Sequence, residues 1–236
     1  MPTVLLSTTY FGPIQWYQKL CRYPRVLIEQ HETFQKQTYR NRCLIATTQG
    51  VQPLTVPVVH SFSTSEEAKP SAKLASCIMD CKLSDHGNWR HLHWQALQSA
   101  YGDSPFFEYY EDDLRPFFAE RRWERLLDFN EAIRQKMCEL LDIQPNVSLT
   151  TSYIPIRQEL PRAQHAEPSS RTECKDLQSD ETYDFREAIR PKHPLADPDF
   201  VPHPYYQVFA QKHGFLPNLS ILDLLFNMGP ESIFYL

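Results

Sequence analysis

The chain has 236 residues, and its 24 Lys and Arg against 29 Asp and Glu give a formal net charge of -5. Hydrophobic residues make up 42% and aromatic residues 13%, which is typical of a folded globular protein. This charge balance supplies no overall positive field for nucleic acid or for an anionic membrane surface, so we expect no nucleic-acid binding.

The apolar segments and the cysteines argue against secretion and membrane insertion. The first residues, MPTVLLSTTYFGP, lack a basic n-region and a long apolar stretch, so they predict no signal peptide. The longest apolar run, LSILDLLFNM, is shorter than the ~20 residues of a membrane helix and contains Asp223. The six cysteines include no CxxC pair, which argues against structural zinc. We therefore expect a cytoplasmic protein with reduced thiols and no metal.

The first thirty residues predict a strand–helix–strand unit. Val4 to Tyr10 begins with apolar residues and continues with β-branched ones, as in a buried strand. A Gly-Pro turn follows, and apolar residues from Ile14 to Cys21 recur at helical spacing. Val26 to Glu29 predicts the second strand. If both strands share a sheet, the expected connection is a parallel crossover.

A hairpin and a further strand are expected next. Residues 43–48 and 54–59 predict two arms joined across Gln49-Gly50, and Pro57 makes the second arm an edge strand. The polar, Ser-rich residues 61–76 predict a surface loop. The stretch CIMDCKL, residues 77–83, alternates between apolar and polar side chains and predicts a half-exposed strand.

The second half of the chain is expected to be mainly helical. One helix follows residue 88 with Leu92, Ala96 and Ala100 on one face; a second starts near Phe107, and a third, long and amphipathic, runs from about Trp123 to Leu141. The charged block 157–182 predicts a linker or surface excursion. The segment LSILDLLFNMGP predicts a buried C-terminal helix that ends at a Gly-Pro pair, with Asp223 on its polar stripe.

Together these segments predict an α/β protein in one domain of residues 1–236. The N-terminal strand–helix–strand unit and the hairpin would form a mixed sheet, followed by the helical second half. The P-loop, dinucleotide-binding and serine-hydrolase motifs GxxxxGK[ST], GxGxxG and GxSxG are all missing, so the corresponding chemistries lack support.

The stretch KQTYRNRCLI, residues 36–45, concentrates cations in an acidic protein. If 38–43 is extended, Arg40 and Arg42 share a face about 7 Å apart and can hold a diphosphate or carboxylate, with Lys36 adding a third charge. The alternative is that the two arginines pair with acidic residues of the same chain, namely Glu29, Glu32 or Asp80.

Histidines and aromatic residues give further candidates. In DHGNWRHLHW, the side chains of His91 and His93 diverge on a helix, which argues against a metal site formed with His86. Tyr10 lies at the C-terminal end of a predicted strand, where ligands bind in open α/β sheets, and can stack on a sugar or belong to the core.

Three blocks of the sequence resemble the WbqC-like protein family. They are YRNRCLI with LTVPV, then NWRHLHWQALQSAYGDSPFFEYY, and the terminal GFLPNLSILDLLFNMGPESIFYL. The resemblance covers nearly the whole chain and is weakest at 61–76 and 157–182. Members of the family are found among bacterial genes for surface-polysaccharide and O-antigen synthesis, so the resemblance implies that setting, while the reaction of the family is poorly defined.

The resemblance selects candidate residues within these blocks. The first block implies an anion site that includes Lys36, Tyr39, Arg40, Asn41 and Arg42. His93 matches the single histidine of the second block, so it is expected to be a general base, with Trp89 and Tyr101 of the same block among the substrate-binding residues. The alternative is a structural histidine buried beside Trp89 and Tyr101.

Two functions follow from this selection. The first is a cytoplasmic acyl- or aminoacyl-transferase that acts on an activated amino sugar, with a small anionic or sugar-phosphate ligand as substrate; we assign no cofactor. The second is a non-catalytic protein that binds the same metabolite or supports a partner enzyme.

Overall fold

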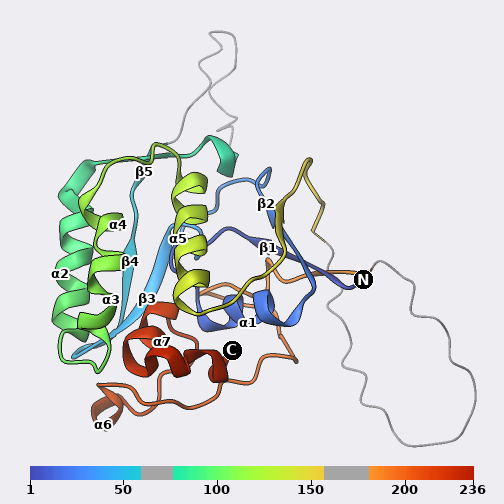
Figure 1. Cartoon of the computed structure of the whole chain (residues 1–236). Helices are drawn as coiled ribbons and strands as arrows, with labels where there is room; N and C mark the ends of the chain where they lie inside the picture. Colours follow the sequence, from blue (N-terminus) through green and yellow to red (C-terminus); the bar gives the residue numbers. More distant parts are fainter. Residues whose placement is uncertain (60–76, 157–180) are drawn as a thin grey trace, which may run out of the picture.

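The structure is a computed structural model that describes residues 1–59, 77–156 and 181–236 (Figure 1). The strands are β1 Thr3–Ser7, β2 Arg25–Glu29, β3 Arg42–Thr47, β4 Gly50–Thr55, β5 Val58–Val59, β6 Lys82–Leu83, β7 Val147–Leu149 and β8 Thr182–Asp184. The α-helices are α1 Ile14–Arg22, α2 Trp89–Tyr101, α3 Phe107–Leu114, α4 Pro116–Ala119, α5 Leu126–Leu140, α6 Ala210–His213 and α7 Ile221–Met228. Three 3-10 helices are η1 Ile78–Asp80, η2 His86–Asn88 and η3 Gly229–Tyr235. The predicted loop 61–76 lies outside the described residues.

A parallel sheet with the strand order β7-β2-β1-β8 carries the N-terminal half. The central strand β1 is buried along its whole length and pairs in parallel with β2 and with β8. The predicted strand–helix–strand unit is confirmed, but β1 ends at Ser7 instead of Tyr10. The chain leaves the sheet there because the Tyr10 amide donates a hydrogen bond to the Tyr39 carbonyl, 2.9 Å away. The predicted excursion 157–182 overlaps β8 at Thr182, which the sequence pattern did not indicate.

The predicted hairpin is present as a two-stranded sheet of its own, β3 and β4, apart from the parallel sheet. The α/β class is confirmed. The second arm is shifted toward the N-terminus, because the turn closes at Gly50 with a φ of 101°, and Thr47 pairs directly with Gly50. The proline of this arm is therefore Pro53, while Pro57 follows it.

The strand predicted at 77–83 is wrong over most of its length. Residues 78–80 form η1, and only Lys82 and Leu83 are extended. Ile78 and Cys81 are both fully buried, and this i, i+3 spacing places two side chains on one side of a 3-10 turn.

The helices of the second half are confirmed, but the buried face of α2 differs from the expected one. Leu92 is exposed, and the core side of α2 carries Trp89, His93, Leu97 and Tyr101. Large aromatic side chains bury more area than leucine or alanine, so they decide which face of the helix packs inward. In the view of Figure 1, α2, α3 and α4 lie on one side of the hairpin and α5 on the other.

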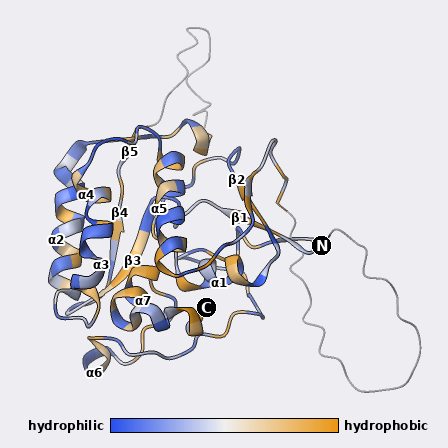
Figure 2. Ribbon diagram, viewed as in Figure 1, coloured by the Kyte–Doolittle hydropathy of each residue, from blue (hydrophilic) through white to orange (hydrophobic). Residues whose placement is uncertain are grey.

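Helix α7 completes the core, as predicted from its apolar sequence. Seven of its eight residues are buried, and Gly229 follows it with a φ of 55°. Backbone hydrogen bonds tie its start to distant segments: the Ser220 amide donates to the Leu44 carbonyl, and the Ile221 amide to the Gly12 carbonyl. Figure 2 shows apolar colouring along β3 and α7, the two elements that meet here.

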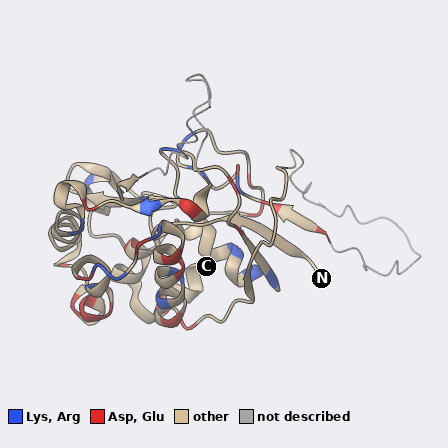
Figure 3. Ribbon diagram, turned by 90° about the horizontal axis from the view of Figure 1, so that it is seen from above, with Lys and Arg blue, Asp and Glu red and all other residues tan. Residues whose placement is uncertain are grey.

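Charged residues are distributed over the surface without a dominant sign. In the view of Figure 3, both basic and acidic residues occur on many parts of the ribbon. Within residues 1–59, 77–156 and 181–236, no helix combines the length and the apolar character needed to cross a bilayer.

Candidate functional site

The carboxyl ends of all four parallel strands carry polar side chains, which belong to two buried clusters, one around Arg40 and Glu32 and one around Glu29 and Arg186. Strand β1 ends at Ser7, β2 at Glu29 and β8 at Asp184, and Thr150 directly follows β7. Parallel strands place their carboxyl ends at a single edge of the sheet, where open α/β proteins bind ligands. This edge of the sheet is therefore a candidate functional site.

Glu29 connects β2 to the segment that follows β7. Its side chain is fully buried and accepts hydrogen bonds from the Thr150 hydroxyl and the His31 amide at Oε1, both at 2.8 Å. Its Oε2 accepts one from the Ile154 amide, also at 2.8 Å. A carboxylate removed from water requires such donors to remain charged.

Arg40 and Glu32 form a buried bidentate ion pair beside the end of β1. The Arg40 Nε donates to Glu32 Oε1 at 2.7 Å, and its Nη2 to Oε2 at 2.5 Å. The same Nη2 donates to the Ser7 hydroxyl at 2.9 Å. The side chains of Arg40 and Glu32 are 3% and 6% exposed. A pair this deeply buried costs several kcal/mol in desolvation per ion, so the two charges depend on each other.

Arg186 occupies the other side of the same edge. Its Nε and Nη2 donate to the two oxygens of Asp184 at 2.9 and 2.6 Å, and Nη2 also donates to the Ile154 carbonyl. Its Nη1 lies 3.7 Å from Glu29 Oε2. Burial lowers the pKa of Arg186, but the hydrogen bonds to Asp184 and the negative charges of Asp184, Glu32 and Glu29 together outweigh that effect, and the net shift is upward.

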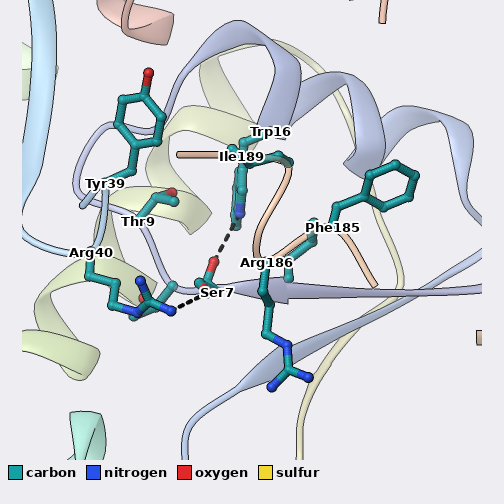
Figure 4. A pocket seen from close by; sticks show the side chains of 10 residues that line it. Ser7, Thr9, Trp16, Tyr39, Arg40, Phe185, Arg186 and Ile189 are labelled. Carbon is teal, nitrogen blue, oxygen red and sulfur yellow. Dashed lines mark hydrogen bonds between the residues drawn. The ribbon is translucent and has the colours of Figure 1, made fainter. Parts of the chain in front are cut away.

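A cavity opens between these two arginines, and we call it the carboxyl-edge cavity (Figure 4). It is lined by Leu6, Ser7, Thr8, Thr9, Trp16, Tyr39, Arg40, Phe185, Arg186 and Ile189. The two charged residues among them are arginines, whose carboxylate partners do not line the cavity. In Figure 4 the Trp16 indole and the Arg40 guanidinium both reach Ser7.

The cavity lies where the strand order of the sheet reverses. From β1 the chain passes through α1 to β2 on one side, whereas β8 pairs with β1 on the other side. Such a switch point leaves a crevice between neighbouring connections. The polar groups of the cavity include one hydroxyl without a hydrogen bond, since Thr9 Oγ1 is buried and has no partner among the described residues.

The structure separates the predicted anion-site residues. Residues 36–41 form turns and bends, so the extended strand expected at 38–43 is wrong, and β3 begins at Arg42. Lys36 is exposed, and the Arg42 Nε donates to the Thr55 hydroxyl. Only Tyr39 and Arg40 of this block line the carboxyl-edge cavity. Arg40 pairs with Glu32, which is the alternative that the sequence left open.

Asn41 and Asn130 hold the turn in place. The Asn41 side chain donates to the Val56 carbonyl at 2.7 Å, and the Val56 amide donates back to the Asn41 carbonyl at 2.8 Å. The Asn130 side chain, from α5, donates to the Arg40 carbonyl at 2.8 Å. These contacts fix the backbone from which the Arg40 side chain reaches Glu32.

His93 is packed among aromatic rings and does not line the carboxyl-edge cavity. The hydroxyl of Tyr10 lies 2.9 Å from its Nδ1, and the Trp89 ring centroid is 5.2 Å from its own. Burial lowers the pKa of His93 to about 4, against a smaller opposite effect of a hydrogen bond with the Thr55 backbone. A neutral imidazole with these contacts matches the structural histidine of the second alternative, although its partner is Tyr10 where Tyr101 was expected.

Tyr101 belongs to a different buried cluster, centred on Asp223. The hydroxyls of Tyr101 and Tyr205 donate to the Asp223 carboxylate at 2.8 and 2.5 Å, and the Gln207 amide donates at 3.0 Å. Burial raises the pKa of Asp223, and the hydrogen bonds from the two tyrosines oppose that shift. This cluster joins α2, α7 and the segment 205–207.

Sequence reasoning missed Ser7, Thr9, Asp184 and Arg186, and named Glu29 and Glu32 only as ion-pair partners. The available signal was the position of polar residues directly after predicted strands. Ser7 and Thr9 fell within a strand that was predicted to continue to Tyr10, so they did not follow its end. Strand β8 was not predicted. Throughout the part of the chain that the structure describes, no group of three or more His, Cys, Asp and Glu is arranged to hold a metal ion.

Comparison with known proteins identifies the family. The WbqC-like protein family matches residues 8–235. A Mycobacterium tuberculosis (strain ATCC 25618 / H37Rv) protein, described as "Uncharacterized protein Rv1507c", is 28% identical over 238 residues, covering 100% of this chain and 98% of that protein. No solved structure gives a significant match. The resemblance seen in three sequence blocks is confirmed over nearly the whole length, and the chain belongs to the WbqC-like protein family.

Proposed function

We propose that this protein is a cytoplasmic transferase of bacterial surface-polysaccharide synthesis that binds an activated, phosphate-bearing amino sugar in the carboxyl-edge cavity. The group transferred to the sugar amine would be an acyl or aminoacyl group. The observation that carries the proposal is the meeting of two buried arginines and three hydroxyl side chains at the switch point of a parallel sheet. The proposed metabolic setting rests on the resemblance to the WbqC-like family, to which the chain belongs.

The cavity has a volume of about 10 Å³, which is room for one water molecule, so a sugar with an attached anionic group would have to widen it. Its lining supplies groups that could hold such a ligand. Arg40 and Arg186 provide cationic character, and the hydroxyls of Ser7, Thr8 and Thr9 provide hydrogen bonds. Aromatic side chains, Trp16 and Phe185 among them, supply flat apolar walls of the kind on which sugar rings pack. Arg40 is balanced by Glu32 and Arg186 by Asp184, and Glu29 lies 3.7 Å from Arg186, so these groups carry no net positive charge. A ligand with one phosphate group and neutral hydroxyls is therefore favoured over a polyanion.

A non-catalytic binding protein is the second candidate function, and a specific observation favours it. General-base catalysis at neutral pH works best with a base whose pKa lies near the working pH. His93, the base expected from the sequence, has a pKa of about 4 and contacts Tyr10 instead of the cavity. The two buried carboxylates beside the cavity, Glu32 and Asp184, are engaged by arginines.

The test separates binding from transfer. The purified protein is screened by thermal shift against amino sugar 1-phosphates and nucleoside-diphosphate amino sugars, with the free amino sugar and the nucleoside diphosphate alone as controls. Each ligand that raises the melting temperature is then incubated with acyl-thioester and aminoacyl donors, and product is sought by mass spectrometry. A mass increase equal to the acyl group supports the transferase. Binding without product under every donor supports the binding protein, and the absence of any thermal shift contradicts both.

A matched pair of variants locates the site in the same assay. Arg40→Lys removes the guanidinium that lines the cavity and donates to the Ser7 hydroxyl, while Arg42→Lys makes the same change two residues away on β3, outside the cavity. We expect Arg40→Lys to weaken binding by about 1–3 kcal/mol and Arg42→Lys to leave it unchanged. A larger loss of affinity for Arg42→Lys than for Arg40→Lys would indicate a ligand site at the hairpin instead.

A further inference from the structure

A second cleft lies at the N-terminal end of α2, and we call it the α2 cleft. It is lined by Asp85, Asn88, Trp89, Arg90, His91, Phe118, Ala119 and Arg121. None of these residues lines the carboxyl-edge cavity. The proposed function makes no use of this cleft, so its residues need a separate explanation.

Arg90 is the buried cation of the α2 cleft. The residue is 7% exposed, and its guanidinium carbon lies 4.4 Å from the centroid of the Trp89 ring. Its Nη1 forms an ion pair with Asp85. Its Nε is buried and has no hydrogen-bond partner within the described residues. A buried donor without a partner is unfavourable, so its presence calls for an acceptor.

The other two buried arginines show what normally fills this position. A guanidinium presents Nε and Nη2 along one edge, and that edge fits the two oxygens of a carboxylate. In Arg40 it holds Glu32, and in Arg186 it holds Asp184. In Arg90 no carboxylate of the described chain occupies it, because Asp85 is bound at Nη1 instead.

The charges around the α2 cleft favour a singly charged anion. Arg90 and Arg121 are positive and Asp85 is negative, which leaves one positive charge before any contribution from His91. The positive end of the α2 dipole adds to it, and no side chain caps this 13-residue helix at its N-terminus. Asp85 would repel a doubly charged phosphate more strongly than a carboxylate.

We infer that the α2 cleft binds a carboxylate-bearing small molecule, with the two carboxylate oxygens on the Nε–Nη2 edge of Arg90 and Arg121 as a second, exposed cation.

The test measures ligand binding through the NMR signals of the arginine side chains themselves. The uniformly 15N-labelled full-length protein is titrated with sodium acetate at constant ionic strength, and the Nε–Hε signals of the arginines are recorded. We expect the Arg90 signal to shift and saturate, while the Arg40 and Arg186 signals stay in place because their edges are already occupied. Sodium chloride and sodium phosphate serve as competing probes, and Arg90→Lys assigns the signal by removing it.

A variant on the surface keeps the test independent of folding. The Arg121 side chain is 70% exposed, so Arg121→Gln leaves the core intact. We expect it to weaken acetate binding roughly two- to fivefold, as for the loss of one exposed charge. An Arg90 signal that does not respond to acetate, or that shifts equally with chloride, overturns the inference. A larger effect of phosphate than of acetate overturns the assignment to carboxylates.

Discussion

Two buried polar regions of this protein hold their buried carboxylates with different kinds of partner. At the carboxyl edge of the sheet, the carboxylates of Glu32 and Asp184 each hold a guanidinium in a bidentate ion pair. In the Asp223 cluster, one carboxylate is held by neutral donors, the hydroxyls of Tyr101 and Tyr205 and the Gln207 amide. Both regions are buried, and the first borders the carboxyl-edge cavity.

The difference indicates different roles. Neutral donors around one carboxylate join distant segments at modest cost, which is what a structural cluster requires. Paired charges cost more to bury and leave charged groups ready at the wall of a cavity, which is what a binding site requires. We therefore propose that the Asp223 cluster serves stability and that the carboxyl edge is the ligand-binding region.

The largest expected effect comes from breaking a charge pair. Arg40→Met leaves the Glu32 carboxylate buried without its cation, and we expect a loss of about 3–5 kcal/mol in the free energy of unfolding, measured with urea. As a control, Lys82→Met removes one partner of the exposed Lys82–Glu124 pair and should leave stability unchanged.

A double variant that removes both partners tests the same ion pair further. Replacing both partners, Arg40→Met with Glu32→Leu, should recover much of the stability, because no unpaired charge remains. A single Arg40→Met variant that unfolds at the parental urea concentration would contradict the assignment of Arg40 and Glu32 to one buried pair.

His93 extends the comparison to a buried group without a counter-charge. Its pKa falls from about 6.5 in the unfolded chain to about 4 in the folded one. Its contribution to stability is therefore complete above pH 6.5 and is lost as the pH falls toward 4, by at most about 3 kcal/mol. The measurement is the difference in unfolding free energy between the protein and His93→Gln across this range. A difference that stays constant with pH contradicts the lowered pKa.

Asp223 should show the opposite dependence. Its pKa is raised by burial, so the folded state binds the proton more tightly than the unfolded one. Its contribution is largest below the unfolded value of about 3.9 and declines as the pH rises through the raised value. The parent should therefore lose stability relative to Asp223→Asn over that interval, and a gain would contradict the direction of the shift.

A smaller effect is expected when one neutral donor is removed. Tyr205→Phe deletes the hydroxyl that donates to Asp223 at 2.5 Å and keeps the ring in contact with Phe215. We expect a loss of about 1–3 kcal/mol in unfolding free energy and no change in ligand affinity. Weaker binding with unchanged stability would show that the Asp223 cluster belongs to the functional site.

Elements with strong local patterns could be predicted from the sequence. The strand–helix–strand unit, the long helix α5 and the buried helix α7 follow from apolar spacing and from the Gly-Pro pair after Met228. The segment 77–83 could not, because its alternating residues fit a strand as well as the turn that buries Ile78 and Cys81.

The candidate site could be predicted only in part. Arg40 was identified together with Glu32 as a possible partner, since opposite charges eight residues apart can meet. Arg186 was not, because the strand that positions it, β8, has three residues and gains its stability from β1. Nothing local in the sequence indicates such a pairing.

Thr9 provides the most direct test of the claim that the carboxyl-edge cavity binds the ligand. Its buried hydroxyl has no partner among the described residues, whereas Thr8 Oγ1 accepts a hydrogen bond from Asn130 at 3.1 Å. The measurement is the dissociation constant of Thr9→Val, with its melting temperature, for the amino sugar nucleotide that stabilises the parent most. We predict an unchanged or higher melting temperature and roughly tenfold weaker binding, because the unpaired hydroxyl is useful only to the ligand. A Thr9→Val protein that binds as tightly as the parent would contradict the account.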